Sequence, residues 1–155
     1  MKSRYDKVAI RSYSTNDFND VKMLWQVVFA NHERWRAPEF AIPAKMTVQP
    51  DLFLVAADGV RVVGTVMGGY DGVRGWFHTV AVLPAYQGRG IGSALLHEAE
   101  SRLVALGCPK INLQVLPSNS GVVEFYRNLG FVIEDRISMA KPVGKFAAVA
   151  SRQEP

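Results

Sequence analysis

The sequence has a single cysteine among its 155 residues, Cys108. One thiol can form neither a disulfide framework nor a site in which several thiolates bind zinc. The three histidines, His32, His78 and His97, lie too far apart in sequence to match a metal-ligand motif. We therefore expect no metal and no structural disulfide, in keeping with the reducing conditions of the cytoplasm.

Long apolar runs are also missing, because no stretch approaches the roughly 18 residues that a membrane-spanning helix requires. The N-terminal segment MKSRYDKVAIRSYS lacks the apolar core of a signal peptide. We therefore expect a cytoplasmic protein without a membrane partner. Lysine and arginine outnumber the acidic residues, 18 to 14, but they are scattered along the chain. Scattered positive charge does not predict a nucleic-acid partner, although it suits a multiply anionic cofactor.

Hydrophobic residues make up 48 % of the chain, which is enough to build a buried core in one domain of this length. Two hairpin turns are predicted, at Asp58-Gly59 and Asp71-Gly72. The apolar patterns predict helices near 18–29, 40–47, 88–105 and 119–129, and strands at 8–13, 52–56, 61–70, 76–82, 110–116, 131–133 and 137–141. The helix at 88–105 makes the strands on either side of it parallel, so the sheet is expected to be mixed.

The segment from Gln87 to Gly92, with the sequence QGRGIG, joins a predicted strand to a predicted helix. Backbone N–H groups at a helix N-terminus attract anions, and glycines let a phosphate approach the backbone closely. Arg89 adds a forked cationic donor. The segment therefore predicts a phosphate-binding loop, with a tight turn that eases the start of the helix as the alternative.

Two familiar phosphate loops do not match this segment. A P-loop needs a lysine after its glycines, and none follows here. A dinucleotide-binding loop needs the spacing G-x-G-x-x-G after the first strand, whereas Gly88, Gly90 and Gly92 alternate after a later strand. The spacing that fits is Gln87-x-x-Gly90-x-Gly92.

This spacing resembles the pyrophosphate loop of the GNAT superfamily of N-acetyltransferases, Q/R-x-x-G-x-G/A. The family's second motif, N-x-x-A-x-x-F-Y-x-x-x-G-F, is matched at Asn119, Phe125, Tyr126, Gly130 and Phe131. Val122 stands where the family usually has alanine. The phrases GTVMGGYDG and GCPKI are similar to the bacterial YpeA-type branch, and the resemblance extends from residue 8 to about residue 141.

The resemblance implies an α/β (α+β) fold with a mixed central sheet of six to seven strands, splayed between the fourth and fifth strands, and about four flanking helices. Residues 1–141 would form a single N-acetyltransferase domain and residues 142–155 a C-terminal tail. Acetyl-CoA is the implied co-substrate. Asn119 would form a hydrogen bond to it, or would serve as an ordinary helix cap instead. The residues expected to bind the cofactor are Val80, Ala81, Val82, Gln87, Gly88, Arg89, Gly90, Ile91, Gly92 and Asn119.

Tyr126 and His78 are the expected catalytic residues. Tyr126 matches the family tyrosine that can protonate the leaving thiolate, although a core aromatic residue at this place is the alternative. His78 resembles the strand-four histidine of the serotonin N-acetyltransferase branch, and strand alternation predicts that it shares a face with Val80. Its imidazole could take a proton from the amine, directly or through a water, or His78 could be a partly buried histidine with a structural hydrogen bond. Asp71, Glu39 or a chain of waters are the alternatives for this base.

The expected function is transfer of an acetyl group from acetyl-CoA to a primary amine by direct attack in a ternary complex. A module that binds acyl-CoA without catalysis is the alternative. The acceptor stays open between a small molecule and a protein N-terminus or lysine, and so does a homodimer. Arg34, Trp35 and Arg36 could meet an aromatic or anionic acceptor, or could form a solvated loop or a dimer contact.

Overall fold

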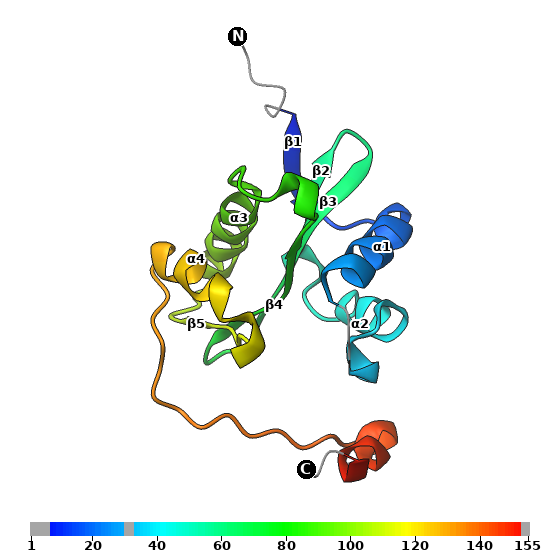
Figure 1. The fold of residues 1–155 in the computed structure, drawn as a ribbon, viewed down its shortest axis with the longest axis vertical. Coiled ribbons are helices and arrows are strands. Elements are labelled where there is room, and N and C mark those ends of the chain that lie inside the picture. The colour runs from blue at the N-terminus through cyan, green and yellow to red at the C-terminus, as the bar shows by residue number, and fades with distance from the viewer. Residues whose placement is uncertain (1–6, 30–32, 153–155) are drawn as a thin grey trace.

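A five-stranded sheet forms the centre of the protein in a computed structural model that describes residues 7–29 and 33–152 (Figure 1). The strands, in their order across the sheet, are β1 (Val8–Ser12), β2 (Phe53–Asp58), β3 (Arg61–Tyr70), β4 (Gly75–Val82) and β5 (Ile111–Asn112). The first four pair antiparallel and β5 pairs parallel to β4, so the predicted mixed sheet is confirmed.

Helices cover both faces of this sheet. Figure 1 shows α1 and α2 on one side and α3 and α4 on the other. Their bounds are α1 Phe18–Val28, α2 Pro38–Lys45, α3 Ile91–Ala105 and α4 Val123–Asn128. Each face has its own hydrophobic core, one around Trp25 and Phe53 under α1 and α2, the other around Leu95 and Leu103 under α3 and α4. Because both faces are covered, β2 and β3 are buried along nearly their whole length.

The prediction of six to seven strands is wrong for the described residues, in which five strands form. Residues 131–133 and 137–141, the two final strands of the prediction, have no strand pairing. Only two residues of β5 are paired, and so short a strand offers little edge for a further ladder. Side chains join the segments instead, because Lys110 and Asn112 each donate a hydrogen bond of 2.6 Å to the Glu134 carboxylate.

The C-terminal part of the chain crosses from the α4 side to the α2 side of the molecule (Figure 1). It ends in a 3-10 helix, Gly144–Arg152, in which the Phe146 ring meets the edges of two aromatic rings. The ring centroids are 5.6 Å from Trp35 and 6.0 Å from Phe40. Nowhere in the described ranges is a helix both long enough and apolar enough to cross a membrane.

Candidate active site

The predicted phosphate loop lies between β4 and the N-terminus of α3. Gly88 and Gly90 have φ angles of +73° and +78°, which glycine adopts without strain. Gly90 occupies the N-cap position of α3, and without a side chain it cannot satisfy the first N–H groups of the helix. Those donors lie at the positive end of a 15-residue helix and suit an anionic ligand.

Side chains around the loop hold it in place. The Gln87 amide nitrogen donates to the carbonyl of Val82 at 3.0 Å, so it ties the loop back to the end of β4. The Arg89 guanidinium lies 5.1 Å from the centroid of the Tyr86 ring. A Cβ added to Gly92 would lie 3.1 Å from the Phe125 ring, so this glycine lets α3 approach the α4 segment closely.

A β-bulge interrupts β4 at Thr79. Thr65 of β3 pairs with Ala81 and Met67 pairs with His78, which leaves one extra residue on β4. Thr79 has a φ of +49°, a strained value for a β-branched residue. The buried hydroxyl of Thr65 donates to the Thr79 carbonyl at 2.9 Å and accepts a hydrogen bond of 3.0 Å from the indole N–H of Trp25. This chain of hydrogen bonds joins α1 to the bulge through β3.

The bulge also changes which face of the sheet each side chain of β4 meets. His78 lies opposite Met67, which belongs to the core under α1 and α2. Val80 packs instead against the core under α3 and α4. The prediction that His78 and Val80 share one face is therefore wrong, because the extra residue at Thr79 breaks the alternation of side chains.

β4 and β5 separate soon after they meet. Their ladder contains only Gly75 with Ile111 and Trp76 with Asn112, so the later residues of β4 have no strand beside them on this edge in the described part of the chain. The N–H of Leu83 donates to Val63 of β3 at 2.8 Å. Because backbone groups alternate along a strand, those of Val82 and Val80 are directed to the opposite edge, where the gap lies.

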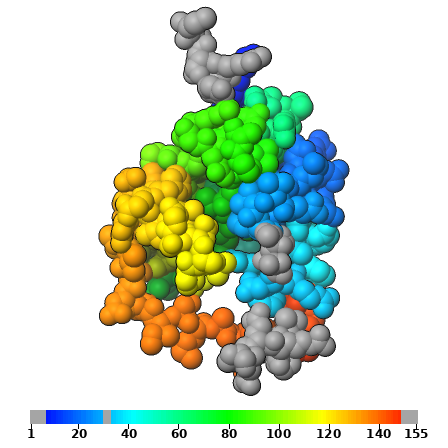
Figure 2. Space-filling view, in the orientation of Figure 1, coloured from blue at the N-terminus to red at the C-terminus, as the bar shows by residue number. Residues whose placement is uncertain are grey.

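The gap opens to the surface next to the phosphate loop. Figure 2 shows a hollow between the yellow residues before and within α4 and the blue residues of α1, with green atoms at its floor. Strands that diverge at their carboxyl ends form the usual ligand-binding crevice of such sheets. The expected splay between the fourth and fifth strands is thus present.

Tyr126 lies on the α3 and α4 side of this gap. Its ring is half-buried, with its centroid 5.1 Å from Phe125 and 5.8 Å from Phe131. Burial raises the pKa of the Tyr126 phenol, so the hydroxyl stays protonated and able to donate at neutral pH. Asn119 lies in the 3-10 turn Pro117–Val122, is exposed, and occupies the N-cap position of neither that turn nor α4.

His78 lies on the other face of the sheet, where its imidazole stacks on Trp76 with a centroid distance of 6.3 Å. The side chain reaches solvent, yet partial desolvation lowers the pKa of His78 below its ordinary value of 6.5. The positive charges of Arg36 and Lys45 lower it further. A histidine of this kind is neutral at pH 7 and can accept a proton. His78 and Tyr126 therefore lie on opposite faces of the sheet.

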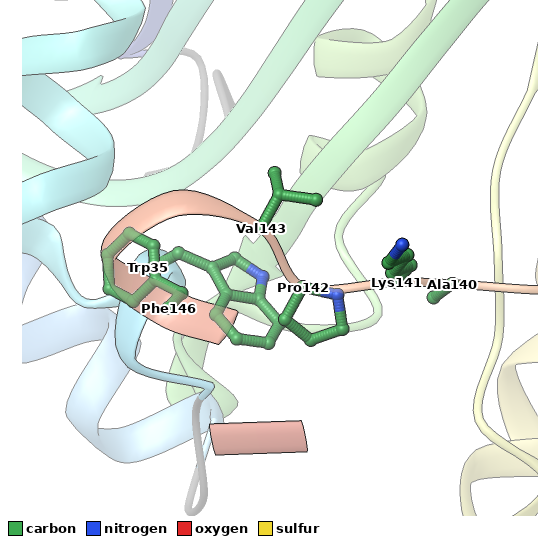
Figure 3. A pocket seen from close by; sticks show the side chains of 6 residues that line it. All are labelled: Trp35, Ala140, Lys141, Pro142, Val143 and Phe146. Carbon is green, nitrogen blue, oxygen red and sulfur yellow. The ribbon is translucent and has the colours of Figure 1, made fainter. Parts of the chain in front are cut away.

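A pocket of about 300 Å³ lies where the C-terminal segment meets the loop before α2. Figure 3 shows Trp35, Phe146 and Pro142 gathered in it, with Ala140 and Lys141 at one end. Trp35, one of the residues that could meet an acceptor, is thus covered in part by the C-terminal segment. Across the described residues, no group of three or more His, Cys, Asp and Glu side chains is arranged to hold a metal ion.

Comparison with known proteins decides the family. A family model described as the acetyltransferase (GNAT) family matches residues 17–131. An acetyltransferase of Sodalis glossinidius is 43 % identical over 128 residues, covering 83 % of this chain and 89 % of that one. An acetyltransferase of Yersinia pestis is 40 % identical over 132 residues, covering 85 % and 93 %. The chain belongs to the GNAT family.

Solved structures agree with this GNAT assignment. Ard1 from Thermoplasma volcanium superimposes with a TM-score of 0.74 at 25 % identity, covering 83 % of this chain and 84 % of that one. The enzyme AAC(6')-Iy, solved with a bisubstrate analogue, gives a TM-score of 0.73 at 15 % identity, covering 88 % and 99 %, and so shares the fold alone. The chain is an acetyltransferase of the GNAT type, and the family supports acetyl-CoA as its co-substrate. The YpeA-type branch stays a prediction.

In this GNAT protein the two carboxylates considered as alternative bases have other partners. Asp71 accepts hydrogen bonds from the N–H groups of Val73 and Arg74, at 2.8 and 2.9 Å, and these bonds lower its pKa. Glu39 forms an ion pair of 2.6 Å with Lys22, which lowers its pKa too. Carboxylates with lowered pKa are weak bases toward an ammonium group.

Three residues near the GNAT site were not predicted from the sequence. Trp25 and Thr65 are 40 positions apart, so the local sequence does not indicate that the Trp25 indole donates to the Thr65 hydroxyl. Nor does it indicate that this hydroxyl donates to the Thr79 carbonyl in the bulge. Lys45 ends α2, and its position relative to His78 depends on how α2 packs over β3. The sequence around Lys45 and around Thr65 contains no motif that indicates these roles.

Proposed function

We propose that this GNAT protein transfers the acetyl group of acetyl-CoA to a primary amine by direct attack within a ternary complex. The observation that carries the proposal is the gap along β4 beyond Trp76, which runs toward the glycine loop at the start of α3. The loop would bind the diphosphate through backbone N–H groups. The backbone groups of Val80 and the N–H of Val82 would bind the amides of the pantetheine arm, whose burial requires hydrogen-bond partners.

The reaction forms a bond between the amine nitrogen and the acetyl carbon and breaks the carbon–sulfur bond of the thioester. His78 takes a proton from the amine, directly or through a water. Tyr126 gives a proton to the departing sulfur, and a backbone N–H of β4 stabilises the negative charge that develops on the carbonyl oxygen. Their positions on opposite faces of the sheet support separate roles as base and acid.

Two variants of Gly90 test the cofactor site. Gly90→Glu places a carboxylate at the N-terminus of α3, where it would repel the diphosphate, and Gly90→Gln imposes the same backbone strain without the charge. We expect calorimetry with coenzyme A to give an affinity at least about tenfold weaker for the Glu variant than for the Gln variant. Equal affinities in two folded variants would overturn the assignment of the loop.

A further inference from the structure

Two cations lie on the same face of the sheet as His78. Lys45 is half-buried at the end of α2, and its ammonium donates a hydrogen bond of 2.5 Å to the carbonyl of Gly68 on β3. Gly68 directly follows Met67, the residue opposite His78 in the ladder. Arg36, in the short 3-10 turn before α2, acts on the same imidazole through its charge.

These cations have little negative charge beside them. In residues 7–29 and 33–152 no carboxylate forms an ion pair with Lys45, whose pKa is lowered by burial. Arg36 meets the Glu33 carboxylate at 3.5 Å, longer than a good charge-assisted hydrogen bond. The carboxylate of Glu39 on α2 is held by Lys22. Keeping the half-buried ammonium of Lys45 without a carboxylate partner is costly in free energy, and an anionic ligand would lower that cost.

We infer that the amine acceptor carries a carboxylate, which Arg36 and Lys45 bind while its amine faces His78. This inference rests on the proposed acetyl transfer and names the class of its acceptor. The same charges disfavour polyamines and lysines within basic peptides, because a second ammonium group would be repelled. They also favour the neutral form of the acceptor amine, which is the form that attacks the thioester.

Matched dipeptides test the inference. Ala-Glu and Ala-Gln, both amidated at the C-terminus, present the same amine with and without a side-chain carboxylate, and Ala-Asp and Ala-Asn form a shorter pair. We expect the release of free thiol from acetyl-CoA to show a kcat/KM about tenfold higher for the acidic member of at least one pair. Arg36→Gln and Lys45→Gln should each lower the ratio of kcat/KM between the acidic and the neutral member of a pair toward one.

Arg136→Gln is the control, since it removes an exposed cation from the segment beyond α4 and should keep the preference. Arg36 lies on an exposed turn, so Arg36→Gln alone tests the preference if Lys45→Gln does not fold. Transfer at equal rates to the acidic and neutral members would overturn the inference while leaving the proposed function in place.

A second measurement does not depend on transfer. NMR titration of His78 should give a higher pKa with the acidic dipeptide bound than with its neutral partner, because the bound carboxylate offsets the two cations. If no dipeptide is acetylated but this rise occurs, the carboxylate site stands and the proposed transfer to amines fails. An unchanged His78 titration with the acidic members would overturn the inference.

Discussion

The charges around His78 determine the pH at which its imidazole can act as a base. Desolvation, Arg36 and Lys45 all lower its pKa, so the imidazole becomes protonated only below about pH 6.5. Activity that needs the neutral form is present above this pKa and is lost as the pH falls through it. We therefore expect the acidic limb of the profile of kcat/KM against pH to lie below 6.5.

Arg36→Gln should move this limb to higher pH, because one of the charges that oppose protonation is removed. The measurement is the pH dependence of thiol release with one fixed neutral acceptor. His78→Gln should abolish the limb. A profile that is identical in the parent protein and in His78→Gln would remove the imidazole from the mechanism.

The Tyr126 phenol is expected to act on the leaving sulfur and not on binding. Burial raises its pKa and keeps it protonated at neutral pH. Tyr126→Phe should lower kcat by about 100-fold, with the affinity for acetyl-CoA little changed. Tyr70→Phe is the matched control, since its hydroxyl contacts only backbone carbonyls near the Asp71-Gly72 turn. Full activity in Tyr126→Phe would assign the acid to another group.

At the scale of single residues, the loop could be predicted because its chemistry is local. The left-handed conformations of Gly88 and Gly90 follow from glycine itself, and the helix N-terminus follows directly. Arg36 and Lys45 could not be assigned a common role, since they come near His78 only when α2 packs over β3.

At the scale of elements, the bulge in β4 sets the direction of the backbone N–H groups of Val80 and Val82. The Thr65 hydroxyl joins the Trp25 indole to the Thr79 carbonyl; Trp25 and Thr65 are buried and Thr79 is half-buried. Thr65→Val removes the hydroxyl without changing the shape of the side chain. Two polar groups then lose their partner, so the free energy of unfolding should fall by about 1–3 kcal/mol.

Activity should respond as well, because a relaxed bulge no longer directs the amides of Val80 and Val82 to the gap. We expect Thr65→Val to lower kcat about tenfold and Thr65→Ser, which keeps the hydroxyl, to restore it. Urea unfolding and steady-state kinetics on both variants check this. Wild-type kcat in Thr65→Val would show that the hydrogen-bond chain does not position β4.

At the scale of elements, the hairpin strands and α3 could be predicted from turn residues and apolar periodicity. α3 begins at Ile91 and not at Gly88, because both intervening left-handed glycines lie outside helical geometry. The strands expected at 131–133 and 137–141 do not form, since local β propensity cannot supply the partner edge that a strand needs. The hydrogen bonds at the bulge join residues 14 and 40 positions apart, so the local sequence does not predict them.

At the scale of the whole molecule, the proposed function assigns the two substrates to opposite faces of the sheet. The core under α3 and α4 supports the glycine loop, Val80 and Tyr126, and the cofactor is proposed to bind on this side. The face under α1 and α2 carries His78, Arg36 and Lys45, and the acceptor is proposed to bind on this side. In the proposed function, the acetyl group and the amine meet in the gap between β4 and β5. Length and composition predicted one core-forming domain, but this division follows from the bulge and needed the structure.

Amide hydrogen exchange with and without saturating acetyl-CoA tests the central claim most directly. The account predicts that the cofactor slows exchange at Val80, Val82 and the first turn of α3, and leaves β1 unchanged. Binding of acetyl-CoA with no added protection at these amides, or no saturable binding, would contradict it.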